Sequence, residues 1–500
     1  MVGWSTGEPR RRRRGAWPGD GRGRGDSAAR LIAIILLPAL LVTVRARGAV
    51  AGAVDGVVES SLRALHQGEF ARAVDGFQQA AKASPGAPEP LFFVVFSRWW
   101  QLIFAESAIS KSDPVFDQAA ESTMLAARAR LEVEPGNARA LAVLGGAQVL
   151  RSHLEALRSN YFRSGQEARR GKKALDQALL IDAGLDIALF PAGALNYYAD
   201  RVPLLVKGLR PLFFFPGGDA ALGLGQIRQV AEGHGPFRTD GRLLLAQICA
   251  DRYQRSYLEA LGHFRVALDE NPGSPLIAAA IGDLQIRLGE YGAAAGTFAA
   301  AIEQAVGDDP ERSRHRQWLM LGLAEAQLGD WNVESAEATL RQALLASAPH
   351  SSSLRKTARR LEEELGYKRA AVPLLLSVSP GEGASGVPGA IDDAIRADPD
   401  APLPRYLRGR ILLLAGRTEE ALLSLREAAG TAVGAPPSLS GWIELLSGTA
   451  EARLCRLREA RTHFRRASGI RHFRAADRGR LELQERGEHA AACAVDESPG

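Results

Sequence analysis

The sequence predicts an all-α chain in which helical hairpins stack into a solenoid, and three observations support this. A small or aromatic residue recurs after 34 residues at four places, which pair Tyr257 with Tyr291, Ala260 with Ala294, Phe264 with Phe298, and Ala267 with Ala301. A period of this length is typical of a two-helix unit that stacks on similar units. The chain is rich in Ala, Leu, Arg and Glu, which favour helices, and runs of β-branched residues are scarce.

The same landmarks identify further units along the chain. Small residues in the first helix let the paired helices approach, an aromatic residue in the second helix fills the space between units, and a proline often ends the second helix. A Gly–acid–aromatic step marks the turn between the two helices, and it reads Gly68-Glu69-Phe70, Gly289-Glu290-Tyr291 and Gly329-Asp330-Trp331.

This pattern resembles the tetratricopeptide-repeat superfamily over most of residues 55–475. The resemblance implies a right-handed superhelix of helical hairpins that presents a binding surface rather than a catalytic pocket. Residues 184–240 depart from the period, and this stretch is similar to a segment of uncharacterised bacterial exported repeat proteins.

The composition divides the chain into two repeat blocks. Residues 52–368 are expected to form an N-terminal solenoid, and residues 390–484 a C-terminal set of repeats. The Gly, Ser and Pro content of SVSPGEGASGVPG at 377–389 predicts a linker or long loop over 369–389. The second block has only two clear units, fewer than the three or so an independent solenoid needs, so we expect it to dock on the first. Residues 485–500 are polar, which predicts a disordered tail.

Residues 1–51 have the order of features found in a secretory leader. An uncharged apolar run at 31–44 follows several arginines, and small residues at Ala49-Val50-Ala51 follow the run. The run would rise only about 21 Å as a helix, less than the roughly 30 Å of a bilayer core. A cleaved signal peptide is therefore expected, which would place the protein in the periplasm or cell envelope. A retained inner-membrane signal-anchor, or a cytoplasmic protein whose true start lies downstream, are the alternatives.

The net charge of +5 comes from this leader. Of the 62 basic and 57 acidic residues, ten arginines and three acids lie within residues 1–51, so the rest of the chain carries two more acids than bases. A nearly neutral body gives no reason to expect nucleic acid as a partner.

The atypical stretch 184–240 contains three consecutive aromatic residues, Phe213, Phe214 and Phe215. One interpretation makes them the tip of an apolar hairpin that touches a membrane or a partner. The other is a helix pair whose loop phenylalanines pack inward, with Pro216-Gly217-Gly218 as the turn and Asp219 as the N-cap of the next helix.

In the family, fixed positions of each first helix line the concave face. Transferred to this sequence, they give seven candidate partner-binding residues: Asp283, Arg287, Arg316, Tyr406, Arg410, Trp442 and Arg453. Family members that clamp a chaperone's carboxylate end carry Lys and Asn at two such positions, where this chain has Ala279 with Asp283 and Leu319 with Leu323. The resemblance therefore implies an extended or helical peptide ligand rather than a charged tail.

The sequence contains no recognised catalytic or metal-binding motif. It has no H-E-x-x-H, no G-x-S-x-G and no Cys/His metal spacing. We therefore expect no catalytic residues, no metal and no cofactor. The predicted function is a non-catalytic protein–protein interaction scaffold or assembly factor of the bacterial cell envelope. A cytoplasmic adaptor of the same fold, and a membrane-associated enzyme or lipid-handling protein, are the alternatives.

Overall fold

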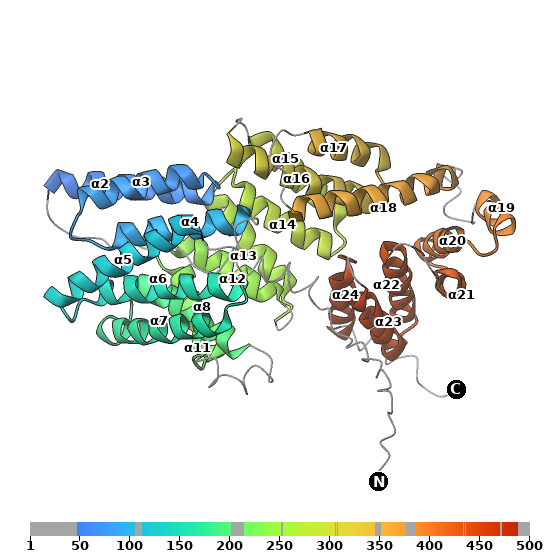
Figure 1. The fold of residues 1–500 in the computed structure, drawn as a ribbon. Helices are drawn as coiled ribbons and strands as arrows, with labels where there is room; N and C mark the ends of the chain where they lie inside the picture. The colour runs from blue at the N-terminus through green and yellow to red at the C-terminus, as the bar shows by residue number, and fades with distance from the viewer. Residues whose placement is uncertain are drawn as a thin grey trace, which may run out of the picture.

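The computed structural model describes residues 48–105, 113–201, 215–251, 254–305, 307, 309–345, 352–376, 387, 389–433, 435, 437–470 and 473–488. Within these ranges every regular element is a helix, which confirms the predicted all-α class (Figure 1). Residues 1–47 of the predicted leader, Phe213, Phe214 and residues 377–386 of the predicted loop lie outside the described residues, and residues 48–51 begin α2.

Most of the helices pair into antiparallel hairpins in chain order. The N-terminal block contains α2 (Gly48–His66), α3 (Phe70–Ala83), α4 (Glu89–Ala105), α5 (Pro114–Val133), α6 (Ala138–Leu157), α7 (Tyr161–Ile181), α8 (Asp186–Asp200), α11 (Ala220–Glu232), α12 (Arg238–Ala250), α13 (Tyr257–Glu270), α14 (Pro275–Arg287), α15 (Tyr291–Gln304), α16 (Pro310–Gly329), α17 (Val333–Leu345) and α18 (Ser352–Leu376). The C-terminal block contains α19 (Gly389–Ala397), α20 (Pro402–Leu414), α21 (Thr418–Thr431), α22 (Pro437–Arg453), α23 (Leu457–Gly469) and α24 (Ala476–Glu488).

The turns between paired helices follow the sequence landmarks with one exception. Gly68 and Gly289 have φ values of 77° and 74°, a left-handed conformation that glycine adopts without steric cost. At the third step the left-handed residue is Trp331, with φ 63°, and Gly329 is the last residue of α16. A Cβ on Gly329 would lie 2.1 Å from the Tyr291 ring, so this glycine is needed for close packing rather than for the turn.

The atypical stretch forms the helix pair α8–α11 that the second interpretation predicted. The Asp219 carboxylate accepts hydrogen bonds from the backbone N–H groups of Ala221 and Leu222, as an N-cap does. Gly193 and Gly223 lie where a Cβ would meet the facing helix backbone at 3.0 Å and 2.6 Å, so α8 and α11 are in close contact. Phe215 is half-buried just before this cap.

The apolar helix α4 belongs to the core. Phe92, Phe96 and Trp99 are all fully buried against neighbouring helices. Among the described residues, none of the helices combines the length and apolar character needed to cross a bilayer.

The first hairpin, α2–α3, contacts helices far along the chain. His66, at the end of α2, lies 3.0 Å from a carboxylate oxygen of the buried Asp240 on α12. Beside it, Glu69 pairs with Arg312 of α16, and the Phe70 ring meets His315 edge-on at 5.9 Å. The first hairpin is therefore packed against α12 and α16.

Two predicted boundaries differ from the structure at their edges. Helix α18 continues to Leu376, so residues 369–376 are helical rather than linker. Helix α24 continues to Glu488, past the predicted start of the tail at residue 485. Each extension continues a helix that is already formed and contains Ala, Leu, Glu or Arg, which favour helices.

The two blocks share apolar contacts. Trp331 and Tyr367 of the N-terminal block pack against the C-terminal cluster that contains Ile391 and Tyr406. The guanidinium of Arg410 also lies 5.3 Å from the centroid of the Trp331 ring.

We therefore expect a protease that cuts at Gly383–Gly386 to leave two fragments that stay together, because the blocks bury apolar surface against each other. Gel electrophoresis under denaturing conditions should show two fragments where size-exclusion chromatography shows one species. Fragments that elute separately would contradict the docked arrangement.

Candidate functional site

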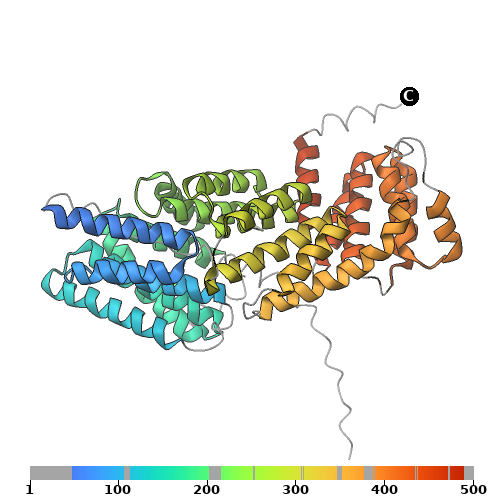
Figure 2. The same cartoon turned by 90° about the horizontal axis from the view of Figure 1, so that it is seen from above.

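The predicted groove residues of α14 lie against the last helical segment of the chain. In Figures 1 and 2 helix α24 stands between the α14–α16 helices and the α22–α23 hairpin, and the packing of α24 on α14, α22 and α23 agrees. We call residues 473–483, which enter and begin α24, the docking segment.

Arg474 is the first anchor of the docking segment. Its guanidinium pairs with Asp283 of α14, and its Nη1 lies 2.9 Å from Oε2 of Glu325 on α16. Glu325 also pairs at 2.8 Å with Arg360 of α18. Burial works to raise the pKa of Glu325, but Arg360 and Arg474 outweigh it and hold that pKa below its usual value. Glu325 therefore stays a carboxylate that recognises a cation.

Asp477 is the second anchor. Its carboxylate accepts hydrogen bonds from Arg287 at 2.6 Å and 2.8 Å, and from the Tyr257 hydroxyl at 3.0 Å. Burial favours the neutral acid, but Arg287 and Arg480 outweigh it and keep the pKa of Asp477 below its ordinary value. Charge-assisted bonds to a carboxylate are stronger than neutral ones, so this contact is specific as well as stabilising.

Four side chains of the N-terminal block thus receive the docking segment: Tyr257, Asp283, Arg287 and Glu325. We call this set the cradle. Asp283 and Glu325 bind Arg474, and Tyr257 and Arg287 bind Asp477. Arg474 lies just before α24 and Asp477 lies in its first turn, so the cradle binds a basic and an acidic residue that are three positions apart in the sequence.

Apolar contacts flank both anchors. The Phe473 ring lies 5.5 Å from the Trp442 ring of α22, and Trp442 in turn lies 5.9 Å from Tyr291 of α15. At the other end Leu481 is buried in the core cluster of the N-terminal block. The docking segment is therefore held by charged bonds in its middle and by buried apolar residues at both ends.

Three of the seven predicted partner-binding residues, Asp283, Arg287 and Trp442, meet at the docking segment. The other four contact other parts of the chain. Tyr406 is 2% exposed in the core of the C-terminal block, and Arg410 stacks on Trp331. Arg316 donates to the carbonyl of Ala305, and Arg453 donates to the carbonyl of Leu413 at 2.7 Å.

Sequence reasoning missed Tyr257 and Glu325 as recognition residues. Tyr257 was assigned only as a packing residue of the repeat, and its ring does pack, but its hydroxyl also reaches Asp477. Glu325 lies outside the family's groove positions. The available signal was the match between Asp283 and Arg287, four residues apart on one helix, and Arg474 and Asp477, three residues apart at the start of another.

A buried His–Asp pair lies away from the cradle. His66 and Asp240 are 7% and 0% exposed, and they tie α2 to α12 inside the N-terminal block. Burial acts to lower the pKa of His66, but the Asp240 carboxylate outweighs it and raises that pKa. Because both side chains are buried, this pair links the end of α2 to α12.

No family model matches the chain, and no curated protein matches it. Solved structures that resemble it include yeast Tom70, at 11% identity over 89% of this chain and 99% of that chain with a TM-score of 0.26. A monomeric IFIT1 mutant with Gppp-AAAA matches at 14% identity over 90% and 95% of the two chains, with a TM-score of 0.31. The TPR domain of P58(IPK) matches at 12% identity over 81% and 99%, with a TM-score of 0.20. The helix pairs, the 34-residue period and the interlocking small and aromatic residues form a solenoid of stacked helical hairpins, which is the fold that the resemblance to tetratricopeptide repeats implies.

Proposed function

We propose that this protein is a non-catalytic interaction scaffold whose cradle binds a helical segment of a partner protein. The observation that supports this most directly is that the cradle holds a peptide segment of the chain itself, through Arg474 and Asp477. A surface that recognises one helix by charge and flanking apolar contacts suits another helix with the same features.

The contacts of the docking segment support a partner with three features. It should present an acidic residue in the first turn of a helix, a basic residue three positions before it, and an apolar residue just before the basic one, as Phe473 precedes Arg474. The docking segment and such a partner would compete for the cradle. The partner's affinity would therefore be lowered by the free energy needed to displace the docking segment.

The test uses the full-length chain and a labelled peptide with the sequence of residues 470–488. We expect weak binding to the wild-type chain, whose cradle is occupied, and at least about tenfold tighter binding to an Arg474→Ala/Asp477→Ala chain, a change that corresponds to about 1.4 kcal/mol. Adding Asp283→Asn and Arg287→Gln to that chain should abolish the gain. Arg465→Ala, on the exposed face of α23, is the control and should change nothing. Equal affinity for all four chains would contradict the proposal.

We further propose that the scaffold works in the bacterial cell envelope, on the support of the leader-like order of residues 1–51. Fractionation of tagged cells should place the protein in the periplasm or on the inner membrane. An intact leader together with a purely cytosolic signal would favour the cytoplasmic adaptor instead.

A further inference from the structure

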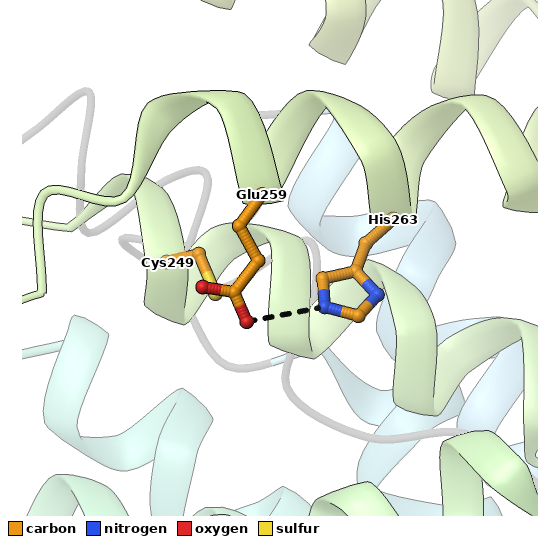
Figure 3. A group of neighbouring side chains, drawn as sticks. All are labelled: Cys249, Glu259 and His263. Atoms are coloured by element: carbon orange, nitrogen blue, oxygen red, sulfur yellow. Dashed lines mark ion pairs between the residues drawn. The ribbon is translucent and has the colours of Figure 1, made fainter.

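Three side chains able to bind a metal converge on the α12–α13 hairpin (Figure 3). Cys249 lies near the end of α12, and Glu259 and His263 lie one turn apart on α13. One ligand atom from each lies within 4.8 Å of the other two, and His263 Nε2 is 3.8 Å from a Glu259 carboxylate oxygen.

We propose that Cys249, Glu259 and His263 bind a zinc ion. A thiolate, an imidazole and a carboxylate are the protein ligands zinc uses, and a thiolate disfavours hard cations such as Mg²⁺ and Ca²⁺. The thiolate and the carboxylate together supply two negative charges, which neutralise one divalent cation.

The separations fit zinc after small side-chain movements. Zinc bonds of about 2.0–2.3 Å in a tetrahedron place neighbouring ligand atoms roughly 3.2–3.7 Å apart. The three ligand atoms lie within 4.8 Å of one another here, a limit about 1 Å longer than the separations in a zinc site. Glu259 and His263 can supply this movement because both side chains are partly in solvent, at 49% and 30% exposure.

The three ligands differ in their exposure to solvent. Cys249 is 5% exposed and forms the floor, whereas Glu259 and His263 form a rim that solvent reaches. A hydrated ion can therefore enter from the rim. Three protein ligands leave one tetrahedral position for water, as in zinc sites that are not closed by a fourth side chain.

The site lies beside an anchor of the cradle. The carbonyl of Ala250, next to Cys249, accepts a hydrogen bond of 3.0 Å from Arg287, and the same guanidinium binds Asp477. A zinc ion would fix the end of α12 to α13 and so hold that carbonyl in place. The zinc site does not depend on the proposed function, because its ligands are separate from the cradle residues.

The test is metal binding to the full-length chain after treatment with a chelator. We expect one Zn²⁺ per chain by competition with a chromophoric chelator, and a Co²⁺ complex whose spectrum contains a thiolate-to-cobalt charge-transfer band. Cys249→Ser should remove that band. Cys249→Ser and His263→Gln should each weaken zinc binding by at least about 100-fold, since even the loss of an outer-shell partner costs about 10–100-fold.

The matched control is His463→Gln, because His463 also pairs with a glutamate, Glu444 at 2.7 Å. Circular dichroism would show that each variant is folded. Zinc binding that survives both Cys249→Ser and His263→Gln, or a cobalt complex of the wild-type chain with no thiolate band, would overturn the proposal. The absence of one-to-one binding would overturn it as well.

Discussion

Replacing Phe298 with alanine is expected to destabilise the N-terminal block by about 3–5 kcal/mol, the usual cost of truncating a buried aromatic side chain. Phe298 is 3% exposed on α15 and lies between Gly282 of α14 and Gly322 of α16. A Cβ built on either glycine would lie 2.5 Å from its ring, so the ring fills the space between two successive repeats. The measurement is the midpoint of urea unfolding, followed by circular dichroism.

A double-mutant cycle of Gly322 and Phe298 tests directly whether the glycine and the ring are in contact. Gly322→Ala should destabilise the wild-type chain, because its methyl group would overlap the Phe298 ring. The same change should be much less costly in the Phe298→Ala chain, where the ring is gone. The two effects should therefore be strongly non-additive. Leu258→Ala, at a side chain that is 66% exposed, is the control.

The loss should spread mainly to neighbouring repeats, because repeats contact chiefly their neighbours, and we expect unfolding to take more than one step. Additive effects of Phe298→Ala and Gly322→Ala, or a Phe298→Ala chain as stable as the wild type, would show that the repeat register is wrong.

Lowering the pH from 6.5 to 4 is expected to destabilise the protein through two neutral histidines, the buried His315 and the half-buried His153. Burial lowers the pKa of both His153 and His315 to about 4. The His153 ring accepts a hydrogen bond from the Trp99 indole at 3.2 Å, and His315 is 3% exposed under the α2–α3 turn. Burial disfavours the charged imidazolium form of both rings.

The direction in which stability changes with pH follows from proton linkage. Below pH 6.5 the unfolded chain binds a proton at each histidine while the folded chain does not, so stability falls until the pH reaches the folded pKa near 4. For His315 the loss is on the order of 3 kcal/mol, from about 1.4 kcal/mol per pKa unit. His153 is only partly buried by exposed area, so its share is smaller. The pKa of His66 is raised, so the stability that its protonated form contributes is lost as the pH rises above 6.5.

The measurement is the urea midpoint of the wild-type and His315→Gln chains from pH 4 to pH 7.5. We expect a steep fall in the wild-type midpoint below pH 6.5 and a shallower fall in His315→Gln. Replacing the exposed His234 with glutamine is the control, and its curve should follow the wild type. Parallel curves for wild type and His315→Gln would show that His315 does not carry this pH dependence.

The repeat architecture could be predicted because its determinants are local. A hairpin of helices depends on residues within about one period, so the recurrence of Ala294, Phe298 and Ala301 identifies the unit directly. The N-cap at Asp219 was likewise predictable, since a capping side chain bonds to backbone N–H groups two or three residues on. The displaced turn at Trp331 was not, because the nearby Gly329 is required by the ring of Tyr291, on a different helix.

The hairpins, their order and the helices that could present a binding face follow from the sequence, because each of these depends on contacts within one or two repeats. The contacts made by the face of α14 depend instead on how distant parts of the chain pack. Arg287 and Asp477 are 190 residues apart, and no periodic pattern links them. The same holds for Cys249, Glu259 and His263, which a turn between two helices brings together without any metal-binding spacing. The superhelix sets which distant charges approach each other, and that curvature is the sum of small rotations at every interface between repeats.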